Sequence, residues 1–300
     1  MAAWIASAAL IVVAATLACA QPEMPAPVDG LIRATLSAGD ITVVVGNHAD
    51  HGAGKTGYIG LHSLTHIAEG TNLFVPRYAG IITSRSQASI VRDGATGAWL
   101  QHSYDGSPSQ LIHYTVAPPH YVDLEIARTS GGAGFWLNSA SYMNGPTDRH
   151  IYFLDIDGQW QKHFDPEHGN AASVYPHGMA LPTLQKVADA TYKHGTNSFA
   201  DSVSEWRYDP ATAFYYGRFG DMVYMQMFPP DCGVVFYMSP TGGGAQSDGR
   251  SNPAWDWRGY FAPEALSDET GALRIRVVYK PYVSDEDCLD EYRKWVETLD

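Results

Sequence analysis

Several short stretches of the sequence combine histidine, tyrosine and arginine, the side chains that transfer protons and bind anions. Tyr175 and His177 flank a proline in a predicted loop, and Tyr216 and Arg218 flank a glycine. Histidine titrates near neutral pH, and tyrosine can exchange a proton when a nearby cation lowers its pKa. Arginine binds a carboxylate through two parallel hydrogen bonds. These residues are candidate proton donors and acceptors beside an anion-binding group; the alternative is that the loop histidines are solvated and idle.

Aromatic and polar residues in a later stretch have the chemistry of a sugar-binding surface. Asn252, Trp255, Asp256 and Arg258 stand close together, and His150 lies further upstream. Aromatic rings stack on the C–H faces of sugars, while neighbouring polar groups bind hydroxyls or carboxylates. With 8 Trp and 18 Tyr in the chain, many aromatic residues must belong to the core. We expect the aromatic residues flanked by Gly and Pro to lie in loops and to bind ligand.

Histidines also gather near the N-terminus, where His48, Asp50, His51 and His66 occur. His48 and His51 are weak candidates for ligands of a divalent metal. A catalytic or sugar-binding histidine is the better interpretation, and His66 is a candidate base. Residues 49–56 match a relaxed phosphate-loop pattern, but the residues that follow have poor helix propensity, so we interpret the match as coincidence. We expect no cofactor and leave a divalent metal open.

Carboxylate pairs, the mark of a glycosidase, are less evident. Asp155 and Asp157 point to the same side if their segment is extended. The glycine that follows them favours a simpler interpretation as a strand end and turn. Asp221 and Asp256 are further candidates, and none stands out. The chain has no G-x-S-x-G elbow that would support an esterase.

Apolar runs with period-two alternation predict that the chain is built of antiparallel strands. Arg274 and Arg276 should face one side of the last strand, and Ile275 and Val277 the other. The chain's 29 Gly and 18 Pro cluster between such runs, as turn residues do. The predicted fold is all-β, a large antiparallel β-sandwich forming a single domain over residues 21–300. The predicted strands are 41–45, 111–116, 121–126, 151–154, 222–228, 234–238 and 273–279.

Helix signals occur at two places. Residues 181–192 predict a short helix, and Ser284 can cap a second, C-terminal helix with Asp287 three residues on. We expect this second helix to pack over an open end or edge of the sheets. The residues on its apolar face are Leu289, Tyr292, Trp295, Val296 and Leu299.

The first 20 residues indicate export. They carry no charged side chain, and an apolar run ends in an A-x-A pattern that predicts cleavage before Gln21. Processing as a lipoprotein at Cys19 is the alternative. We therefore expect a secreted or periplasmic protein. Cys232 and Cys288 could pair in such an oxidising compartment, or remain two buried free thiols.

The length, the antiparallel character and the Gly- and Arg-rich aromatic stretches resemble the galactose-mutarotase-like supersandwich proteins. Residues 72–80, 214–219 and 252–257 look like stretches of uncharacterised secreted bacterial proteins. The supersandwich group holds sugar epimerases, some glycoside hydrolases and domains of several polysaccharide lyases. The resemblance implies a β-supersandwich that acts on carbohydrates. It assigns no catalytic role, because no family signature aligns residue by residue.

The charge balance restricts the partners. The chain has 19 Lys and Arg against 32 Asp and Glu, for a net charge of −13. This acidic balance argues against nucleic acid and against anionic membrane surfaces, which are bound by basic patches. We expect a polysaccharide or oligosaccharide partner, without membrane insertion, and the sequence does not indicate an oligomeric state.

The sequence predicts a polysaccharide lyase that cleaves a uronic-acid glycan by β-elimination, because histidine, tyrosine and arginine are present without an obvious carboxylate pair. Arg218 would neutralise the sugar carboxylate. His177 or His66 would be the base, and Tyr216 or Tyr175 the acid.

Two alternatives stay open. A glycoside hydrolase or sugar epimerase of the same fold would act on a neutral sugar through aspartates. A non-catalytic carbohydrate-binding protein would depend on Trp255 or Trp257 and cleave no bond.

Overall fold

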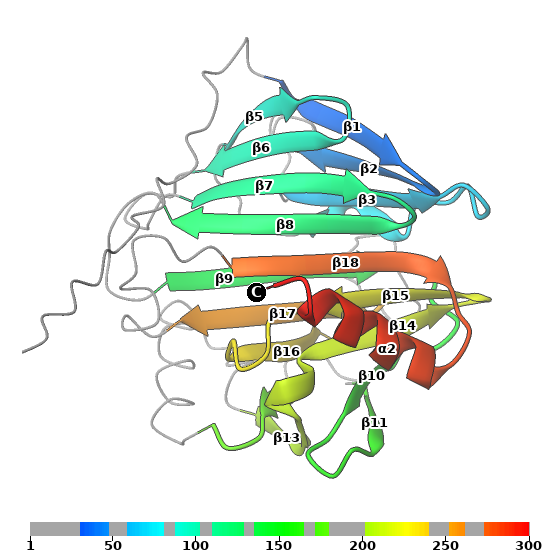
Figure 1. Cartoon of the computed structure of the whole chain (residues 1–300), viewed down its shortest axis with the longest axis vertical. Helices are drawn as coiled ribbons and strands as arrows, with labels where there is room; N and C mark the ends of the chain where they lie inside the picture. The colour runs from blue at the N-terminus through cyan, green and yellow to red at the C-terminus, as the bar shows by residue number, and fades with distance from the viewer. Residues whose placement is uncertain are drawn as a thin grey trace, which may run out of the picture.

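β-Strands arranged in three sheets dominate the chain (Figure 1). The predicted export segment and the helix predicted over 181–192 lie outside the described part of the chain. The computed structural model describes residues 31–47, 59–80, 88–102, 110–128, 135–164, 172–179, 202–239, 252–261 and 273–299.

The largest sheet has nine strands, all paired antiparallel. In spatial order they are β11 (Trp160–His163), β10 (Ile151–Leu154), β14 (Phe214–Phe219), β15 (Met222–Met227), β18 (Leu273–Pro281), β8 (Tyr121–Arg128), β7 (Gln110–Ala117), β6 (Gly97–His102) and β5 (Ala88–Asp93). The central strand, β18, joins two halves of the sheet that come from different parts of the sequence.

The other two sheets have six and three strands. In the six-stranded sheet β12 and β13 are parallel, and the remaining pairs are antiparallel. Its spatial order is β13 (Ser202–Tyr208), β12 (Ala172–Pro176), β16 (Val234–Ser239), β17 (Ala254–Phe261), β9 (Phe135–Met143) and β4 (Phe74–Gly80). The three-stranded sheet consists of β1 (Arg33–Ala38), β2 (Ile41–Gly46) and β3 (Gly60–His66).

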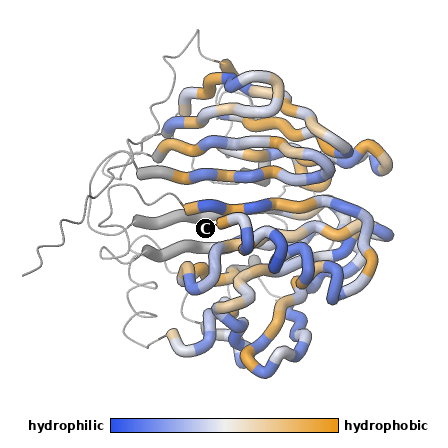
Figure 2. Tube along the Cα trace, viewed as in Figure 1, coloured by the Kyte–Doolittle hydropathy of each residue, from blue (hydrophilic) through white to orange (hydrophobic). Residues whose placement is uncertain are grey.

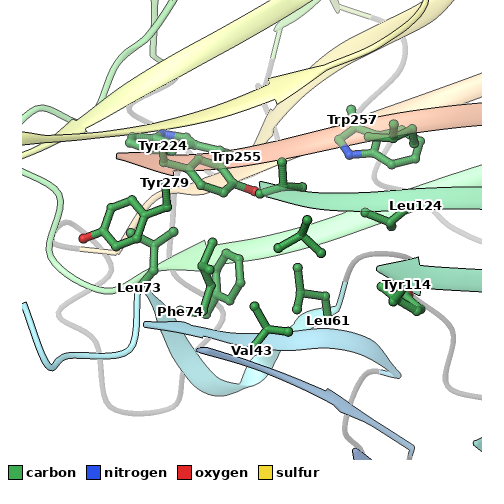
Figure 3. Close-up of a cluster of buried hydrophobic side chains, with 14 of the residues drawn as sticks. Val43, Leu61, Leu73, Phe74, Tyr114, Leu124, Tyr224, Trp255, Trp257 and Tyr279 are labelled. Atoms are coloured by element: carbon green, nitrogen blue, oxygen red, sulfur yellow. The ribbon is translucent and has the colours of Figure 1, made fainter. Parts of the chain in front are cut away.

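One buried cluster draws side chains from all three sheets (Figure 3). Val43 of β2, Tyr114 of β7, Leu124 of β8 and Trp257 of β17 are all fully buried in it. Each side chain of this size stabilises the fold by about 1.5–3 kcal/mol when it leaves water. The predicted antiparallel β-sandwich is therefore confirmed, with its core between the nine-stranded sheet and the two smaller ones.

The predicted alternation is also confirmed. In β18 the side chains of Ile275 and Val277 are at most 1% exposed, whereas Arg274 is half exposed. Figure 2 shows hydrophilic and hydrophobic residues alternating along this strand. All seven predicted strands coincide with observed ones, to within two residues at their ends.

Helix α2 (Asp285–Val296) begins where the sequence predicts it. Ser284 Oγ accepts a hydrogen bond from the backbone N–H of Asp287 at 3.1 Å, which caps the helix. The expectation that the helix covers an open end or edge is wrong. The helix packs on the outer face of the nine-stranded sheet, because Phe214 of β14 and Val223 and Met225 of β15 present apolar side chains there. The residues buried between α2 and the sheet are Phe214, Tyr216, Val223, Met225, Met227, Val278, Cys288, Tyr292 and Trp295.

Among the described residues, no helix is long and apolar enough to span a bilayer.

Gly217 marks a close approach of two sheets. A Cβ atom at this position of β14 would overlap the indole ring of Trp255 in β17. The glycine therefore admits a large aromatic ring into the core, directly between the two outward-facing residues Tyr216 and Arg218.

Candidate functional site

Strand β14 presents Tyr216 and Arg218 on the outer face of the nine-stranded sheet. Its residues alternate between the faces, and Tyr215 and Phe219 pack into the core on the inner side. Tyr216 pairs across the sheet with Tyr152 of β10, and their rings stack with centroids 5.0 Å apart. Two of the predicted catalytic residues thus share a surface with β10.

The first residue of α2, Asp285, binds two tyrosines of this surface. Tyr216 Oη donates a hydrogen bond to Asp285 Oδ1 at 2.5 Å, and Tyr282 Oη donates to the same oxygen at 2.6 Å. The guanidinium of Arg218 lies over the Tyr282 ring, 3.3 Å from its centroid. This cation–π contact fixes the arginine beside the start of the helix.

A second carboxylate, Asp148, holds a histidine beside the same tyrosines. Asp148 Oδ1 lies 2.5 Å from His150 Nδ1, and Asp148 Oδ2 accepts a hydrogen bond from Tyr152 Oη. With Nδ1–H directed at the carboxylate, His150 offers Nε2 as a proton acceptor. The side chains of Asp148 and His150 are each 33% exposed, so this pair is accessible from solvent.

The side chain of Arg218 makes a hydrogen bond within its own hairpin turn. Its Nη2 donates to the carbonyl of Gly220 at 3.3 Å, and its Nε is buried without a hydrogen-bond partner among the described residues. The backbone N–H of Thr147 donates to the carbonyl of Arg218 at 3.0 Å, so the segment that carries Asp148 lies beside the strand that carries Arg218. We name this surface the Arg218 cluster, which consists of Asp148, His150, Tyr152, Tyr216, Arg218, Tyr282 and Asp285.

Hydrogen bonds and burial set the protonation states of the cluster. Burial favours the neutral form of Asp148, but the hydrogen bonds from Tyr152 and His150 outweigh it and lower the pKa of this carboxyl. Burial, and then the hydrogen bond to Asp285, raises the pKa of Tyr282 to about 12, and the same causes raise the pKa of Tyr216. At neutral pH Asp148 is ionised and the phenols are protonated.

Tyr175 and His177 lie apart from the Arg218 cluster. Tyr175 belongs to β12 and is 1% exposed, so its predicted place in a loop is wrong. It packs with Val235 and Met179, and the guanidinium of Arg207 lies 5.8 Å from its ring centroid. His177 is exposed in the turn after β12. The described contacts of these two residues do not reach the cluster.

The predicted sugar-binding stretch is a strand of the six-stranded sheet. Trp255, Asp256 and Arg258 all belong to β17, and half-buried Asn252 precedes it, so the predicted loop placement is wrong for the first three. Trp255 is fully buried and Asp256 is 5% exposed. Trp255 Nε1 donates to the carbonyl of Arg149 at 2.9 Å, directly beside the cluster histidine. The indole therefore supports the Arg218 cluster from the core.

His66, the N-terminal histidine predicted as a base, lies on the three-stranded sheet. His66 ends β3 and is 4% exposed, 4.0 Å from the carboxylate of Asp40. His48 and His51 lie outside the described residues. Within the described part of the chain, no three His, Cys, Asp or Glu side chains are grouped so that they could hold a metal ion.

Asp155, one of the carboxylates considered for a glycosidase, holds a turn together. Asp155 Oδ1 accepts hydrogen bonds from the backbone N–H groups of Asp157 and Gln159, at 3.0 and 2.9 Å, which confirms the predicted turn. In Asp148, Asp155 and Glu291, burial favours the neutral acid, but donated hydrogen bonds outweigh it and lower the pKa. A glycosidase acid requires a raised pKa instead.

A cavity of about 120 Å³ lies beside the C-terminal end of α2, away from the predicted site residues. Both of its arginines are paired with carboxylates. Arg276 makes two hydrogen bonds to Asp123, at 2.6 and 2.8 Å, and Arg274 Nε lies 3.4 Å from Glu125. These pairs leave the cavity less suited to an anionic ligand than the Arg218 cluster.

Cys232 and Cys288 are free thiols, which decides between the two alternatives left open by the sequence. Burial raises the pKa of each thiol to about 12. Both therefore stay protonated and unreactive at neutral pH.

Four residues of the cluster were not singled out by the sequence: Asp148, Tyr152, Tyr282 and Asp285. Tyr152 lies within a predicted strand and Asp285 starts the predicted helix. The missing information was which face of which sheet the helix covers. β15 indicates this face, because its residues are buried on both sides of the sheet and show no alternation of polar and apolar side chains.

Comparison with known proteins identifies no family. No family model matches the sequence, and no curated protein matches it. Similar solved structures include an α-N-acetylgalactosaminidase from Bifidobacterium bifidum, at 10% identity and a TM-score of 0.48. That alignment covers 89% of this chain and 39% of the other, so this chain spans about two fifths of the glycosidase. Another is an aldose epimerase homologue from C. elegans, at 8% identity and a TM-score of 0.42, covering 84% and 100% of the two chains.

Proposed function

We propose that this protein is a carbohydrate-active enzyme that cleaves a uronic-acid glycan by β-elimination at the Arg218 cluster. The observation that supports this most is the pairing of His150 with Asp148 on the same surface as Arg218. The pair provides an oriented base, and the arginine provides a cation for a sugar carboxylate. β-Elimination needs both in one place.

The reaction assigns a task to each group. Arg218 binds the uronate carboxylate and makes the adjacent C5–H acidic. His150 Nε2 removes the C5 proton, and the electron pair of that bond forms the C4=C5 double bond. The C4–O bond breaks at the same time, and the leaving oxygen takes a proton from a phenol. The products are an unsaturated uronate and a free hydroxyl end.

Tyr282 is suited to the role of the acid. Its pKa of about 12 keeps the phenol protonated at neutral pH, while an alkoxide leaving group is more basic still. Tyr282 is half-buried beneath Arg218, whereas Tyr216 is 2% exposed. His150 and Tyr282 thus take the roles that the sequence suggested for His177 or His66 and for Tyr216 or Tyr175.

The test is an assay of the purified protein on a panel of acidic and neutral polysaccharides. Ultraviolet absorbance of the conjugated double bond is recorded together with the release of reducing ends. We expect both signals to rise on a polyuronate, and Arg218→Gln and His150→Gln each to lower kcat/KM by at least about 100-fold, as loss of a positioned charge or base does.

Arg274→Gln is the matched control, because Arg274 is an exposed arginine on the same sheet, paired with Glu125 and remote from the cluster. It should leave kcat/KM unchanged. Release of reducing ends without absorbance would replace the proposal with a hydrolase. Binding without either signal would indicate a non-catalytic sugar-binding protein.

A further inference from the structure

Lys162 is an exposed cation on the edge strand of the described nine-stranded sheet, and none of the groups used above includes it. It stands in β11, where its cross-strand partner in β10 is Tyr152. Tyr152 in turn is opposite Tyr216 of β14. Lys162 therefore ends a row of three residues that begins inside the Arg218 cluster.

The side chain of Lys162 stands on the same outer face of the sheet as the Arg218 cluster. Residues directly opposite each other in a sheet project to the same side, and both neighbours of Tyr152 in β10 are fully buried in the core on the other side. Tyr152 and Lys162 consequently face outward. Trp160, two residues before Lys162 in β11, agrees with this, because its ring centroid lies 5.6 Å from that of Tyr216.

Phe164 places an aromatic ring next to the proposed base, two residues after Lys162. It follows β11 directly, and its ring centroid is 5.7 Å from that of His150. The guanidinium of Arg149 lies 5.9 Å from the same centroid. Phe164 is half-buried, so part of its surface is accessible to a ligand. A partly exposed aromatic ring beside polar groups is a surface on which a sugar ring stacks.

Lys162 and Arg218 are placed to contact different parts of a ligand. They are two strands apart and offset by two residues along the strands. With about 4.8 Å between strands and about 3.4 Å per residue, their Cα atoms are roughly 12 Å apart. The guanidinium of Arg218 also lies over Tyr282, which follows β18 on the side of β14 away from β11. A sugar chain that meets both cations therefore offers a carboxylate on two of its units.

The charge of Lys162 is not used within the described part of the chain, where no hydrogen bond or ion pair joins its ammonium group to another residue. Lys280 of β18 is the contrasting case, since it is buried and its Nζ donates to Glu291 at 2.7 Å. The carboxylates of the cluster, Asp148 and Asp285, already accept hydrogen bonds from tyrosines. Lys162 is thus available to the carboxylate of a bound ligand.

We propose that Lys162 and Phe164 form a second sugar subsite, which binds a uronate unit next to the one that reacts. This inference rests on the proposed function, because it takes Arg218 and His150 to hold the reacting unit. The glycan crosses the outer face from β14 toward the sheet edge at β11. Phe164 stacks on the neighbouring sugar ring, and Lys162 binds its carboxylate. The substrate class is therefore a glycan with uronic acids in adjacent units, not one in which each uronate is flanked by neutral sugars.

Steady-state kinetics of the full chain tests the subsite, with oligogalacturonate and oligomannuronate as probes that carry a carboxylate on every unit. Lys162→Gln should raise KM by about fivefold or more, as loss of a charge-assisted hydrogen bond does, and leave kcat unchanged, because the contact lies outside the reacting unit. Lys162→Arg should restore KM. On a hyaluronan oligosaccharide, in which uronates alternate with a neutral amino sugar, Lys162→Gln should have no effect. An unchanged KM on both uronate probes would overturn the proposal.

Lys294→Gln is the matched control, because Lys294 is an exposed lysine in the last turn of α2, at the end away from Asp285. An equal rise of KM in this variant would assign the effect to overall charge and overturn the subsite.

Isothermal titration of the same oligouronates separates this inference from the proposed function. Weaker binding by Lys162→Gln than by wild type, when wild type forms no elimination product, would support the subsite and remove the lyase reaction. Elimination by wild type, with equal binding by Lys162→Gln, would keep the reaction and overturn the subsite. If neither oligouronate binds to wild type, both are overturned.

Discussion

Hydrogen-bond partners and burial decide which side chains of this protein carry charge, and the consequence is clearest at His120. Burial lowers the pKa of His120 below its ordinary value of 6.5, although the charges of Glu291 and Asp40 oppose this. The folded protein therefore binds this proton less readily than the unfolded chain does.

The pH dependence of stability follows from that direction. A histidine whose folded pKa is depressed does not affect stability above its unfolded pKa, and it costs stability as the pH falls below it. We expect the free energy of unfolding to decrease between pH ~7 and pH ~5. Urea unfolding curves recorded at several pH values across this range measure this free energy.

His120→Gln is the variant that isolates the effect, because glutamine keeps polar atoms without titrating. Its free energy of unfolding should depend less on pH in this range. Asp148 and Glu291, whose pKa values are lowered, lose their stabilising charge only below about pH 4.5 and do not interfere. An identical pH slope in the variant would assign the loss of stability to another group.

At the scale of elements, the close approach of β14 and β17 determines where Tyr216 and Arg218 can stand. Gly217→Ala places a methyl group against the buried indole of Trp255. We expect a loss of about 1–3 kcal/mol in stability, as overpacking of a core produces. Because β14 must shift, the Arg218 cluster should also lose activity.

Thermal and urea unfolding measure this loss, and a double variant shows its cause. Gly217→Ala combined with Trp255→Leu removes the ring that the methyl group meets. The double variant should lose less stability than the sum of the two single variants. Strict additivity would contradict a clash with this ring.

The strands were predictable because alternation is a local property. The charged side chains of Arg274 and Arg276 indicate positions that face solvent, and the apolar side chain of Ile275 indicates a position that faces the core. The cluster was only partly predictable, since Gly217 looks like a turn residue but serves to admit the indole of Trp255. The bond from Tyr216 to Asp285 joins residues far apart in sequence, and no local pattern predicts it.

At the scale of the whole molecule, the net charge of −13 opposes the approach of a polyanionic substrate. Salt shortens the range of this repulsion, from ~30 Å at ~0.01 M to ~8 Å at ~0.15 M. We expect kcat/KM on a polyuronate to rise over this range, and activity on short uncharged substrates to stay constant. A fall with salt would show that local attraction at the cluster dominates instead.

The position of β18 has a consequence for how the chain is made. This strand separates β15 from β8 in the nine-stranded sheet, yet β18 and α2 follow every other described strand in the sequence. During synthesis, the strands on both sides must wait with unpaired backbone edges until residues 273–281 arrive. The closing strand and Asp285 then arrive together. A growing chain therefore acquires its complete large sheet and its Arg218 cluster at the same moment, and a chain that stalls before this point exposes strand edges that are prone to aggregate.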